Sequence, residues 1–247
     1  MGCAGSFPSA DSAASCYLLE AEGFRLVIDM GNGALGALQR YAPLFGIDAI
    51  CLSHLHADHC VDLHAYRVAR EWTPSGPLPP VPVYGPAGTP DRIALLSGPG
   101  GDENLANWLT FHQLSPGLRE IGPFRITAAH MNHPVETFGF RVEHNGWSMA
   151  YSADTGETEA LVNLARNADL LLCESTFLDL PQNPPGVHLS GRQAGEHAAK
   201  ADAGQLVLTH LAAWCGKDDL LSEAALAYGG PLSVAVPGQR SGQDDVS

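Results

Sequence analysis

The run Ser53-His54-Leu55-His56-Ala57-Asp58-His59-Cys60 places three imidazoles and one carboxylate within six residues. The apolar residues just before it predict a short buried strand, so the run begins where that strand ends. His54 and His56 are two apart and point the same way in an extended segment. A loop and helix start would turn Asp58 and His59 back toward the same spot. So many polar rings cannot share a hydrophobic core unpaired, whereas imidazole and carboxylate are good zinc ligands. The run therefore predicts a metal site.

Six residues cannot complete two coordination shells, so other parts of the chain must supply further ligands. Three candidates, His133, Asp154 and His210, each follow a short apolar segment that predicts a strand. Loops at strand ends can reach a shared cleft, which makes these side chains the best partners for the first run. His130 competes with His133 for the first of these places, and spacing alone leaves both open.

Apolar segments bounded by turn residues predict nine strands and five helices. The predicted strands are 24–29, 48–53, 81–84, 124–129, 138–143, 148–152, 170–174, 205–209 and 232–236. The predicted helices are 33–41, 89–96, 158–168, 190–204 and 218–228. Strands come first, and mixed strand–helix units follow in two roughly similar halves. This order predicts an α/β fold, an αββα sandwich of two mixed β-sheets flanked by helices, in one domain over residues 1–247.

The composition limits the function classes that remain. The chain has 247 residues, 45% of them hydrophobic, and a formal net charge of −14. It has no apolar run near the roughly 20 residues that a membrane helix needs, and no signal-peptide pattern, so a cytoplasmic protein without a membrane partner is expected. Six scattered cysteines fit reduced thiols. The negative charge disfavours nucleic acid as a partner, although a small anion could still bind a local metal centre.

Five motifs in order resemble the metallo-beta-lactamase superfamily over nearly the whole chain. They are Asp29 in 27–31, His54-x-His56-x-Asp58-His59, His133, Asp154 and His210. The resemblance implies two divalent metal ions, zinc first, with Mn or Fe as alternatives. It assigns His54, His56 and His133 to one ion, and Asp58, His59 and His210 to the other, with Asp154 bridging both. Asp29 would orient the ligand loop, and Asp58 would also serve catalysis.

Further stretches are similar to the tRNase Z branch of that superfamily. Residues 133–141 resemble its His-x-x-x-x-x-Gly-Tyr-Arg stretch, which favours His133 over His130. Residues 168–177 resemble its Glu-Ala-Thr-Phe segment, with Glu174 supporting the centre from behind the ligands. Residues 188–194 resemble its His-x-Thr/Ser helix start. The resemblance implies that His188 contacts the scissile phosphate or protonates the leaving oxygen.

The sequence departs from tRNase Z in the segment 60–132, which we expect to hold a Pro-rich turn and two short helices in place of a long tRNA-gripping arm. The stretches 33–40, 53–60 and 190–191 resemble short actinobacterial cyclic-nucleotide phosphodiesterases. A dinuclear phosphodiesterase of 3′,5′-cyclic nucleotides is therefore the leading hypothesis, in which the two ions activate the attacking water. The implied partner is a small phosphodiester substrate, with a homodimer allowed and Trp214 as a candidate to stack on a base.

Three alternatives stay open. The first is a tRNA 3′-end processing endonuclease, and the second is a lactone or sulfate-ester hydrolase on the same fold. The third is a metal-bound binding module without catalysis, which the intact ligand set disfavours. In addition, relatives usually carry an apolar strand before Gly-Cys-x-Gly-Ser, whereas here Met1 directly precedes Gly2. We expect either a truncated start or a neighbouring strand that lacks its partner.

Overall fold

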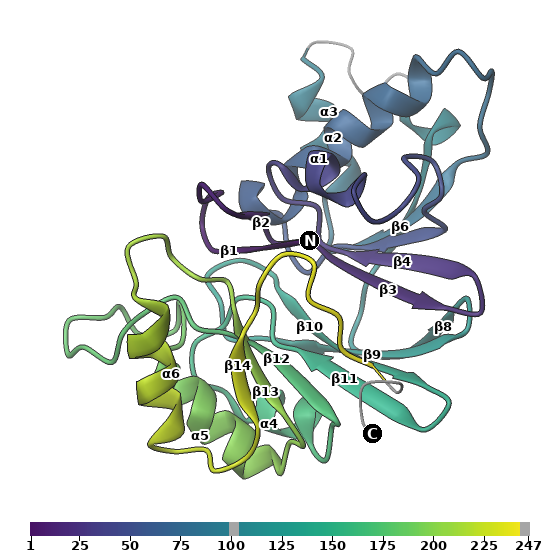
Figure 1. Ribbon diagram of the computed structural model, residues 1–247. Coiled ribbons are helices and arrows are strands. Elements are labelled where there is room, and N and C mark those ends of the chain that lie inside the picture. Colours follow the sequence, from purple (N-terminus) through teal and green to yellow (C-terminus); the bar gives the residue numbers. More distant parts are fainter. Residues whose placement is uncertain (99–103, 243–247) are drawn as a thin grey trace.

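The computed structural model describes residues 1–98 and 104–242 and contains two large mixed β-sheets (Figure 1). The larger sheet has the order β14 (Leu232–Val234), β13 (Leu206–Thr209), β12 (Leu170–Glu174), β11 (Trp147–Tyr151), β10 (Phe138–His144), β9 (Phe124–His130) and β8 (Gly117–Ile121). The smaller sheet has the order β3 (Tyr17–Ala21), β4 (Phe24–Ile28), β5 (Ala49–Cys51), β6 (Val81–Gly85) and β7 (Leu109–Gln113). A short parallel pair is formed by β1 (Gly2–Ala4) and β2 (Ala13–Ala14).

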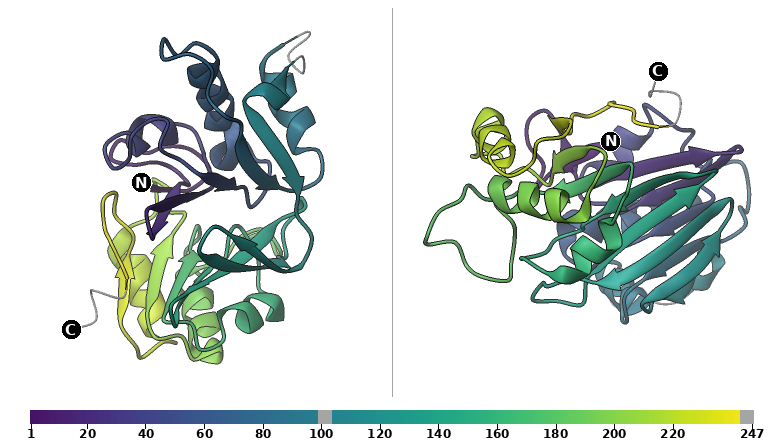
Figure 2. Two further views of the ribbon diagram at one scale, coloured as in Figure 1. Left: turned by 90° about the vertical axis from the view of Figure 1, so that its right-hand side faces the viewer. Right: turned by 90° about the horizontal axis from the view of Figure 1, so that it is seen from below.

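Helices cover the outer face of each sheet, which gives the expected αββα sandwich (Figures 1 and 2). The smaller sheet carries α1 (Ala34–Leu38), α2 (Ala57–Glu71), α3 (Thr89–Leu96) and a 3-10 turn at Leu105–Asn107. The larger sheet carries α4 (Glu159–Ala165), α5 (Gly191–Ala201) and α6 (Lys217–Ala225). No helix in the described ranges is long and apolar enough to cross a bilayer.

The uninterrupted apolar strands follow from this layering. In β4, Leu26 and Ile28 face the core between the sheets, while Val27 packs against the helices of the smaller sheet. In β12, Leu172 faces the intersheet core and Leu171 packs against the helices of the larger sheet. Successive side chains of a strand point to opposite faces, so a strand that is covered on both faces needs apolar residues throughout.

The ends of six strands meet along one edge of the sandwich. In the smaller sheet β4 and β5 run parallel, and in the larger sheet β11, β12 and β13 run parallel. Strand β9 has the same direction as β11, because both are antiparallel to β10. Within each sheet, the carboxyl ends of these strands therefore point the same way, and such ends are where open α/β sheets place their ligand sites.

The segment 60–132 differs from our expectation. Its described part contains most of the 15-residue helix α2, the helix α3, a 3-10 turn and the strands β6, β7, β8 and β9. The predicted helix 89–96 is confirmed as α3, but the second helix, α2, is long and not short. It was not located from the sequence because it begins inside the histidine run, whose polar residues mask its helical periodicity. Strands β7 and β8 were also missed, because their exposed faces are polar and leave only short apolar signals.

The N-terminal residues have pairing partners in the structure. Gly2 exchanges backbone hydrogen bonds with Cys16, at 3.0 and 3.1 Å. Ala4 forms a parallel bridge with Leu211, directly after β13. The first strand thus lies beside the end of the larger sheet.

Candidate metal centre

Seven side chains predicted as ligands lie together at the shared strand edge. They form two groups in which all the potential ligand atoms lie within 4.8 Å of one another. The first group is His54, His56, His133 and Asp154, and the second is Asp58, His59, Asp154 and His210. Both groups contain Asp154, so this carboxylate occupies the place expected of a bridge.

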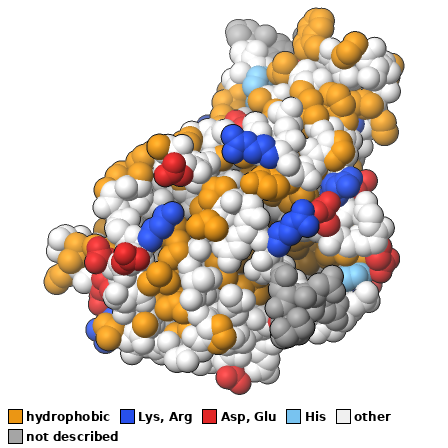
Figure 3. Space-filling view, in the orientation of Figure 1, with side chains coloured by type: hydrophobic (Ala, Val, Ile, Leu, Met, Phe, Trp, Pro, Cys, Tyr) orange, Lys and Arg blue, Asp and Glu red, His pale blue; other side chains and the backbone are white. Residues whose placement is uncertain are grey.

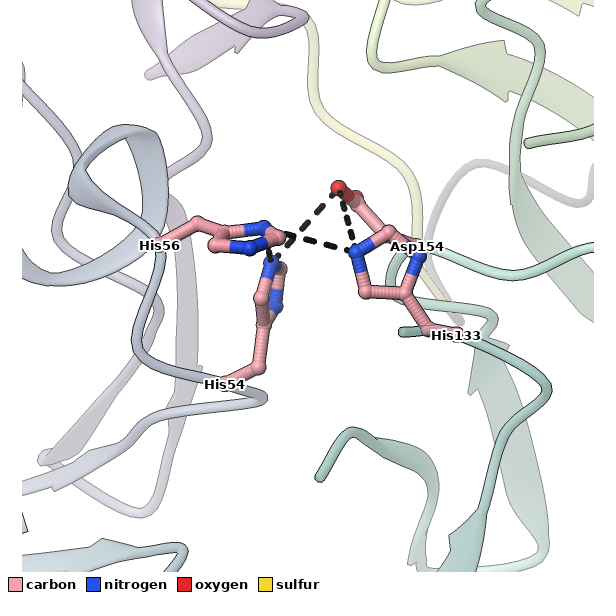
Figure 4. A group of neighbouring side chains, drawn as sticks. All are labelled: His54, His56, His133 and Asp154. Carbon is pink, nitrogen blue, oxygen red and sulfur yellow. Dashed lines mark hydrogen bonds and ion pairs between the residues drawn. The ribbon is translucent and has the colours of Figure 1, made fainter. Parts of the chain in front are cut away.

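The first group joins the two sheets (Figure 4). His54 and His56 come from the loop after β5, and their Nε2 and Nδ1 atoms lie 3.0 Å apart. His133 approaches from the larger sheet, with its Nε2 3.4 Å from His56 Nδ1. Asp154 Oδ2 lies 3.6 Å from His54 Nε2 and 4.0 Å from His133 Nε2. All four side chains thus point their polar atoms at one spot.

The second group is more deeply buried. His59 Nε2 and His210 Nε2 lie 3.2 Å apart. Asp58 Oδ2 is 3.4 Å from His59 Nε2 and 3.1 Å from His210 Nε2. Asp154 Oδ1 is 3.2 and 3.3 Å from the same two nitrogens. Asp154 therefore turns one oxygen to each group, which is the geometry a carboxylate needs to bind two ions at once.

The second ring nitrogen of four of the histidines is held by a neighbouring group. His133 Nδ1 donates to the Val187 carbonyl at 2.9 Å, so in the neutral ring Nε2 keeps a free lone pair. His54 Nδ1 lies 3.0 Å from Ser53 Oγ, and His59 Nδ1 lies 2.8 Å from Asp29 Oδ2. His210 Nδ1 lies 2.8 Å from Thr176 Oγ1. Such partners fix the ring orientation in metal sites.

The residues fit a pair of metal ions. Asp154 Oδ1 is buried and has no hydrogen bond of acceptable geometry, although two ring nitrogens lie close to it. A buried carboxylate oxygen without a donor is costly unless a cation neutralises it. The nitrogen–nitrogen distances of 3.0 to 3.4 Å also match the edge of a coordination tetrahedron. Zinc–nitrogen bonds of about 2.0–2.1 Å give an edge of about 3.3 Å.

The protonation states favour metal binding at the first group. Burial lowers the pKa of His54, His56 and His133, so their rings are neutral near pH 7. Neutral imidazole is the form that binds a metal. For Asp154, burial by itself would raise the pKa, but the charges of His210 and His59 outweigh it and hold the carboxyl well below its usual pKa range. The bridge position is therefore anionic.

Asp29 connects the two sheets behind the ligands. Its Oδ1 accepts the Ser53 amide at 2.7 Å, and its Oδ2 accepts the Ser53 and Tyr151 hydroxyls, both at 2.8 Å. The same Oδ2 faces His59 Nδ1. Tyr151 lies on β11 of the larger sheet, whereas Ser53 and His59 belong to the loop after β5 and to the first turn of α2, beside the smaller sheet. The orienting role of Asp29 stays a prediction, and these hydrogen bonds are the contacts that it requires.

Strained backbone accompanies these contacts. Asp29, Ala153 and His210 have φ of 58°, 52° and 54°, a left-handed conformation that non-glycine residues seldom adopt. Each lies just after a strand, at a point where the chain must turn its side chain or that of its neighbour into the centre. Left-handed residues of this kind cost roughly 1–3 kcal/mol each, and they cluster at functional sites.

Glu174 and His188 form a third group beside the metal ligands. Glu174 Oε1 accepts a hydrogen bond from His188 Nδ1 at 2.9 Å and another from the Thr155 amide at 2.8 Å. Its Oε2 accepts the Thr176 hydroxyl at 2.8 Å, and Thr176 in turn accepts from His210 Nδ1. Burial lowers the pKa of His188, but the charges of Glu174, Asp154 and Asp58 outweigh it and raise this pKa to about 9.

The structure separates the two histidines that compete for one ligand position. His133 lies in the first group, whereas His130 is exposed at the end of β9 and packs its ring against Phe138. The sequence order alone missed several supporting residues. Ser53 directly precedes His54, and Thr176 follows Glu174 by two residues, so their position was a usable signal. Tyr151 lies in an apolar strand and carries no such signal.

The family model for the beta-lactamase superfamily domain matches residues 25–211 of this chain. Uncharacterized protein Rv1339 of Mycobacterium tuberculosis is 42% identical over 246 residues, which cover 96% of this chain and 88% of the relative. The probable metallo-hydrolase YhfI of Bacillus subtilis is 30% identical over 245 residues, 96% of each chain. Its crystal structure superposes with a TM-score of 0.85 over 96% of this chain and 95% of that chain.

The fold and the clustered ligands define a metal-dependent hydrolase. The chain belongs to the metallo-beta-lactamase superfamily. It is also similar to Ribonuclease Z of Mycolicibacterium gilvum, at 28% identity over 85% of this chain and 82% of the relative. The human short form of tRNase Z shares the fold, with a TM-score of 0.75 over 96% of this chain and 95% of that chain at 22% identity. The similarity to Ribonuclease Z supports the predicted tRNase Z-like branch.

Proposed function

We propose that the protein is a dinuclear metal phosphodiesterase that hydrolyses 3′,5′-cyclic nucleotides. The observation that supports phosphodiester hydrolysis is the Glu174–His188 pair, which sets a cationic imidazole beside the bridging Asp154, with His188 Nδ1 4.0 Å from Asp154 Oδ2. Two metal ions in this centre would supply an activated water and neutralise charge on the phosphoryl oxygens. The chain's own residues then have to bind the phosphodiester and protonate its leaving oxygen.

His188 is the residue suited to that proton transfer. Its Nδ1 is committed to Glu174, so a protonated ring has only Nε2–H left to offer a substrate. The ring packs near those of His133 and His210, with centroids 5.6 and 5.3 Å away, so it borders both metal groups. A positioned acid of this kind typically contributes about 10²–10⁴-fold to the rate. A ribose hydroxyl is a poor leaving group and needs that proton.

A small substrate agrees with the surface and with the chain between the ligands. The net charge of −14 repels a polyanion. On the face shown in Figure 3, Lys and Arg side chains lie as separate spots and do not form a continuous band. Within residues 60–98 and 104–132, the helices and strands build the sandwich, and no separate arm extends from it. A cyclic nucleotide needs neither a basic track nor an arm.

A second candidate is tRNA 3′-end processing, which the similarity to Ribonuclease Z favours. The two functions share the ligand set and the Glu174–His188 pair, so the chemistry does not separate them. They differ in the area of contact with substrate, which is extensive for a folded RNA and small for a cyclic nucleotide.

Assays of the purified, metal-replete protein test the proposal. The substrates are cyclic AMP, bis-p-nitrophenyl phosphate, a pre-tRNA with a 3′ trailer, and a lactone. We expect kcat/KM for cyclic AMP to exceed that for the pre-tRNA and the lactone at physiological salt. Efficient trimming of the pre-tRNA with no turnover of cyclic AMP would overturn the proposal. His133→Ala should abolish turnover, whereas His130→Ala, three residues away but outside the cluster, should retain it.

A further inference from the structure

Three aromatic side chains are exposed in the part of the chain that the structure describes. Phe7, Trp72 and Trp214 expose 38%, 76% and 69% of their surface. Trp72 stands alone at the end of α2. Phe7 and Trp214 instead contact each other, with ring centroids 5.3 Å apart and ring planes tilted by 42°. Exposed rings have no role in the core, so their pairing calls for another explanation.

The Phe7 loop is attached to the metal ligand His210. The Gly5 amide donates to the Leu211 carbonyl at 2.9 Å, and the Ser6 amide lies 3.4 Å from His210 Nε2. A Cβ at Gly5 would lie 2.4 Å from the His210 carbonyl oxygen, so only glycine permits this close approach. The residues just before Phe7 are therefore packed against His210 of the second metal group.

Trp214 is held close to the same metal ligand by the chain that follows His210. The Cys215 amide donates to the Ala212 carbonyl at 2.9 Å, which closes a turn with Trp214 inside it. The Cys215 thiol contacts the Thr176 carbonyl at 3.4 Å, and Thr176 supports His210. In Figure 1 the loop between β13 and α6 lies next to the loop between β1 and β2, as this contact requires. Both rings are thus tied to one metal ligand.

We propose that Phe7 and Trp214 form a subsite that binds the nucleobase of the substrate by stacking. This subsite rests on the proposed function, because stacking requires a substrate in which a phosphodiester is joined to an aromatic base. Rings at the rim of the metal centre hold the base while the phosphate reaches the ligands. Aromatic stacking tolerates any base, because every base has a π-face. We expect purines to be preferred over pyrimidines, since the larger ring stacks more strongly.

The matched substrates are cyclic AMP and a base-free ribose 3′,5′-cyclic phosphate. Stacking contributes about 1–3 kcal/mol per base, so Trp214→Ala should lower kcat/KM for cyclic AMP about 5- to 150-fold. The same variant should turn over the base-free analogue like the wild type. Phe7→Ala should show a smaller loss of the same kind, and Trp214→Phe should restore most of the activity. Trp72→Ala, which removes the other exposed tryptophan, should leave both substrates unaffected.

Binding gives a second readout. A cyclic adenosine phosphorothioate, which is hydrolysed slowly, should quench tryptophan fluorescence in the wild type and in Trp72→Phe but not in Trp214→Phe. Equal losses on both substrates, or unchanged quenching in Trp214→Phe, would overturn the subsite. If the wild type fails to hydrolyse cyclic AMP, the proposed function falls. If the wild type is active and Trp214→Ala matches it on cyclic AMP, only the subsite falls.

Discussion

The two sheets contribute to the metal centre in different ways. The smaller sheet supplies His54, His56, Asp58 and His59 from one continuous stretch, the loop after β5 and the first turn of α2. The larger sheet supplies single side chains from the ends of three strands, spread over residues 133–210. Four ligands within six residues lie close together through local structure alone, whereas the dispersed set comes together only when the larger sheet is folded. Neither set completes a coordination shell alone, so the centre forms where the sandwich closes.

The residues that hydrogen-bond to the metal ligands also differ between the two sheets. At the end of β4 in the smaller sheet, the Asp29 carboxylate contacts Ser53 and His59. It also accepts a hydrogen bond from Tyr151 of the larger sheet. At the end of β12 in the larger sheet, Glu174 accepts hydrogen bonds from Thr176 and His188, which also belong to the half of the chain that forms this sheet. Changes at Asp29 should therefore affect metal retention, and changes at Glu174 or His188 should affect the chemistry.

The largest effect is expected from Asp154→Ala, because this carboxylate alone faces both metal groups. We expect the metal content to fall below two ions per chain and kcat to fall by about 10³-fold or more, since metal stabilisation of the transition state is worth several kcal/mol. Asp179→Ala, an exposed control on the loop after Thr176, should change neither quantity. Full metal occupancy with normal turnover in Asp154→Ala would show that Asp154 does not bridge two ions.

His188→Ala should lower kcat on cyclic AMP by about 10²–10⁴-fold, the usual contribution of a general acid. The loss should shrink on bis-p-nitrophenyl phosphate, whose leaving group needs little protonation, while elemental analysis shows unchanged metal. Glu174→Gln should act in the same direction with a smaller loss, since it removes the charge that holds His188. Equal losses on both substrates, or loss of metal, would show that His188 is not the acid. His112→Ala, an exposed histidine on β7, is the control.

Asp29→Asn should weaken metal binding by about 10- to 100-fold, which is typical for partners of metal ligands. The asparagine amide places a donor where the carboxylate accepted hydrogens from Ser53, His59 and Tyr151. Competition with a chromogenic chelator measures the affinity. Asp48→Asn, whose carboxylate accepts only the Arg25 amide among the described contacts, should bind metal like the wild type. If Asp29→Asn bound metal with the affinity of the wild type, Asp29 would not be needed for metal retention.

The smallest effect is expected from Tyr151→Phe, which removes one of the donors to Asp29 and with it one hydrogen bond between the sheets. Loss of a hydrogen bond to a charged group costs about 1.5–3 kcal/mol of the free energy of unfolding, as read by chemical denaturation of the metal-free protein. Metal affinity should fall less than in Asp29→Asn, because the Ser53 and His59 contacts remain. If Tyr151→Phe lowered the metal affinity more than Asp29→Asn does, Tyr151 and not Asp29 would be the main support of the ligands.

The difference between the sheets also explains what could be predicted from the sequence. The loop of the smaller sheet is readable because four ligand-type residues within six positions have no place in a core. His133, Asp154 and His210 were predicted only from their positions after apolar strands, together with the family resemblance. Spacing left His130 and His133 open, since both stand near the end of β9, and the tertiary structure separates them. Phe7 gave no signal at all, because its contact with Trp214 depends on the way β1 meets the end of β13.

The metal content of the wild-type protein tests the central claim most directly. Protein saturated with zinc, freed of loosely bound metal by gel filtration and analysed for metal and protein together should contain close to two ions per chain. That ratio requires ligands from both sheets and a shared Asp154. A ratio of one or below in correctly folded protein would contradict a dinuclear centre.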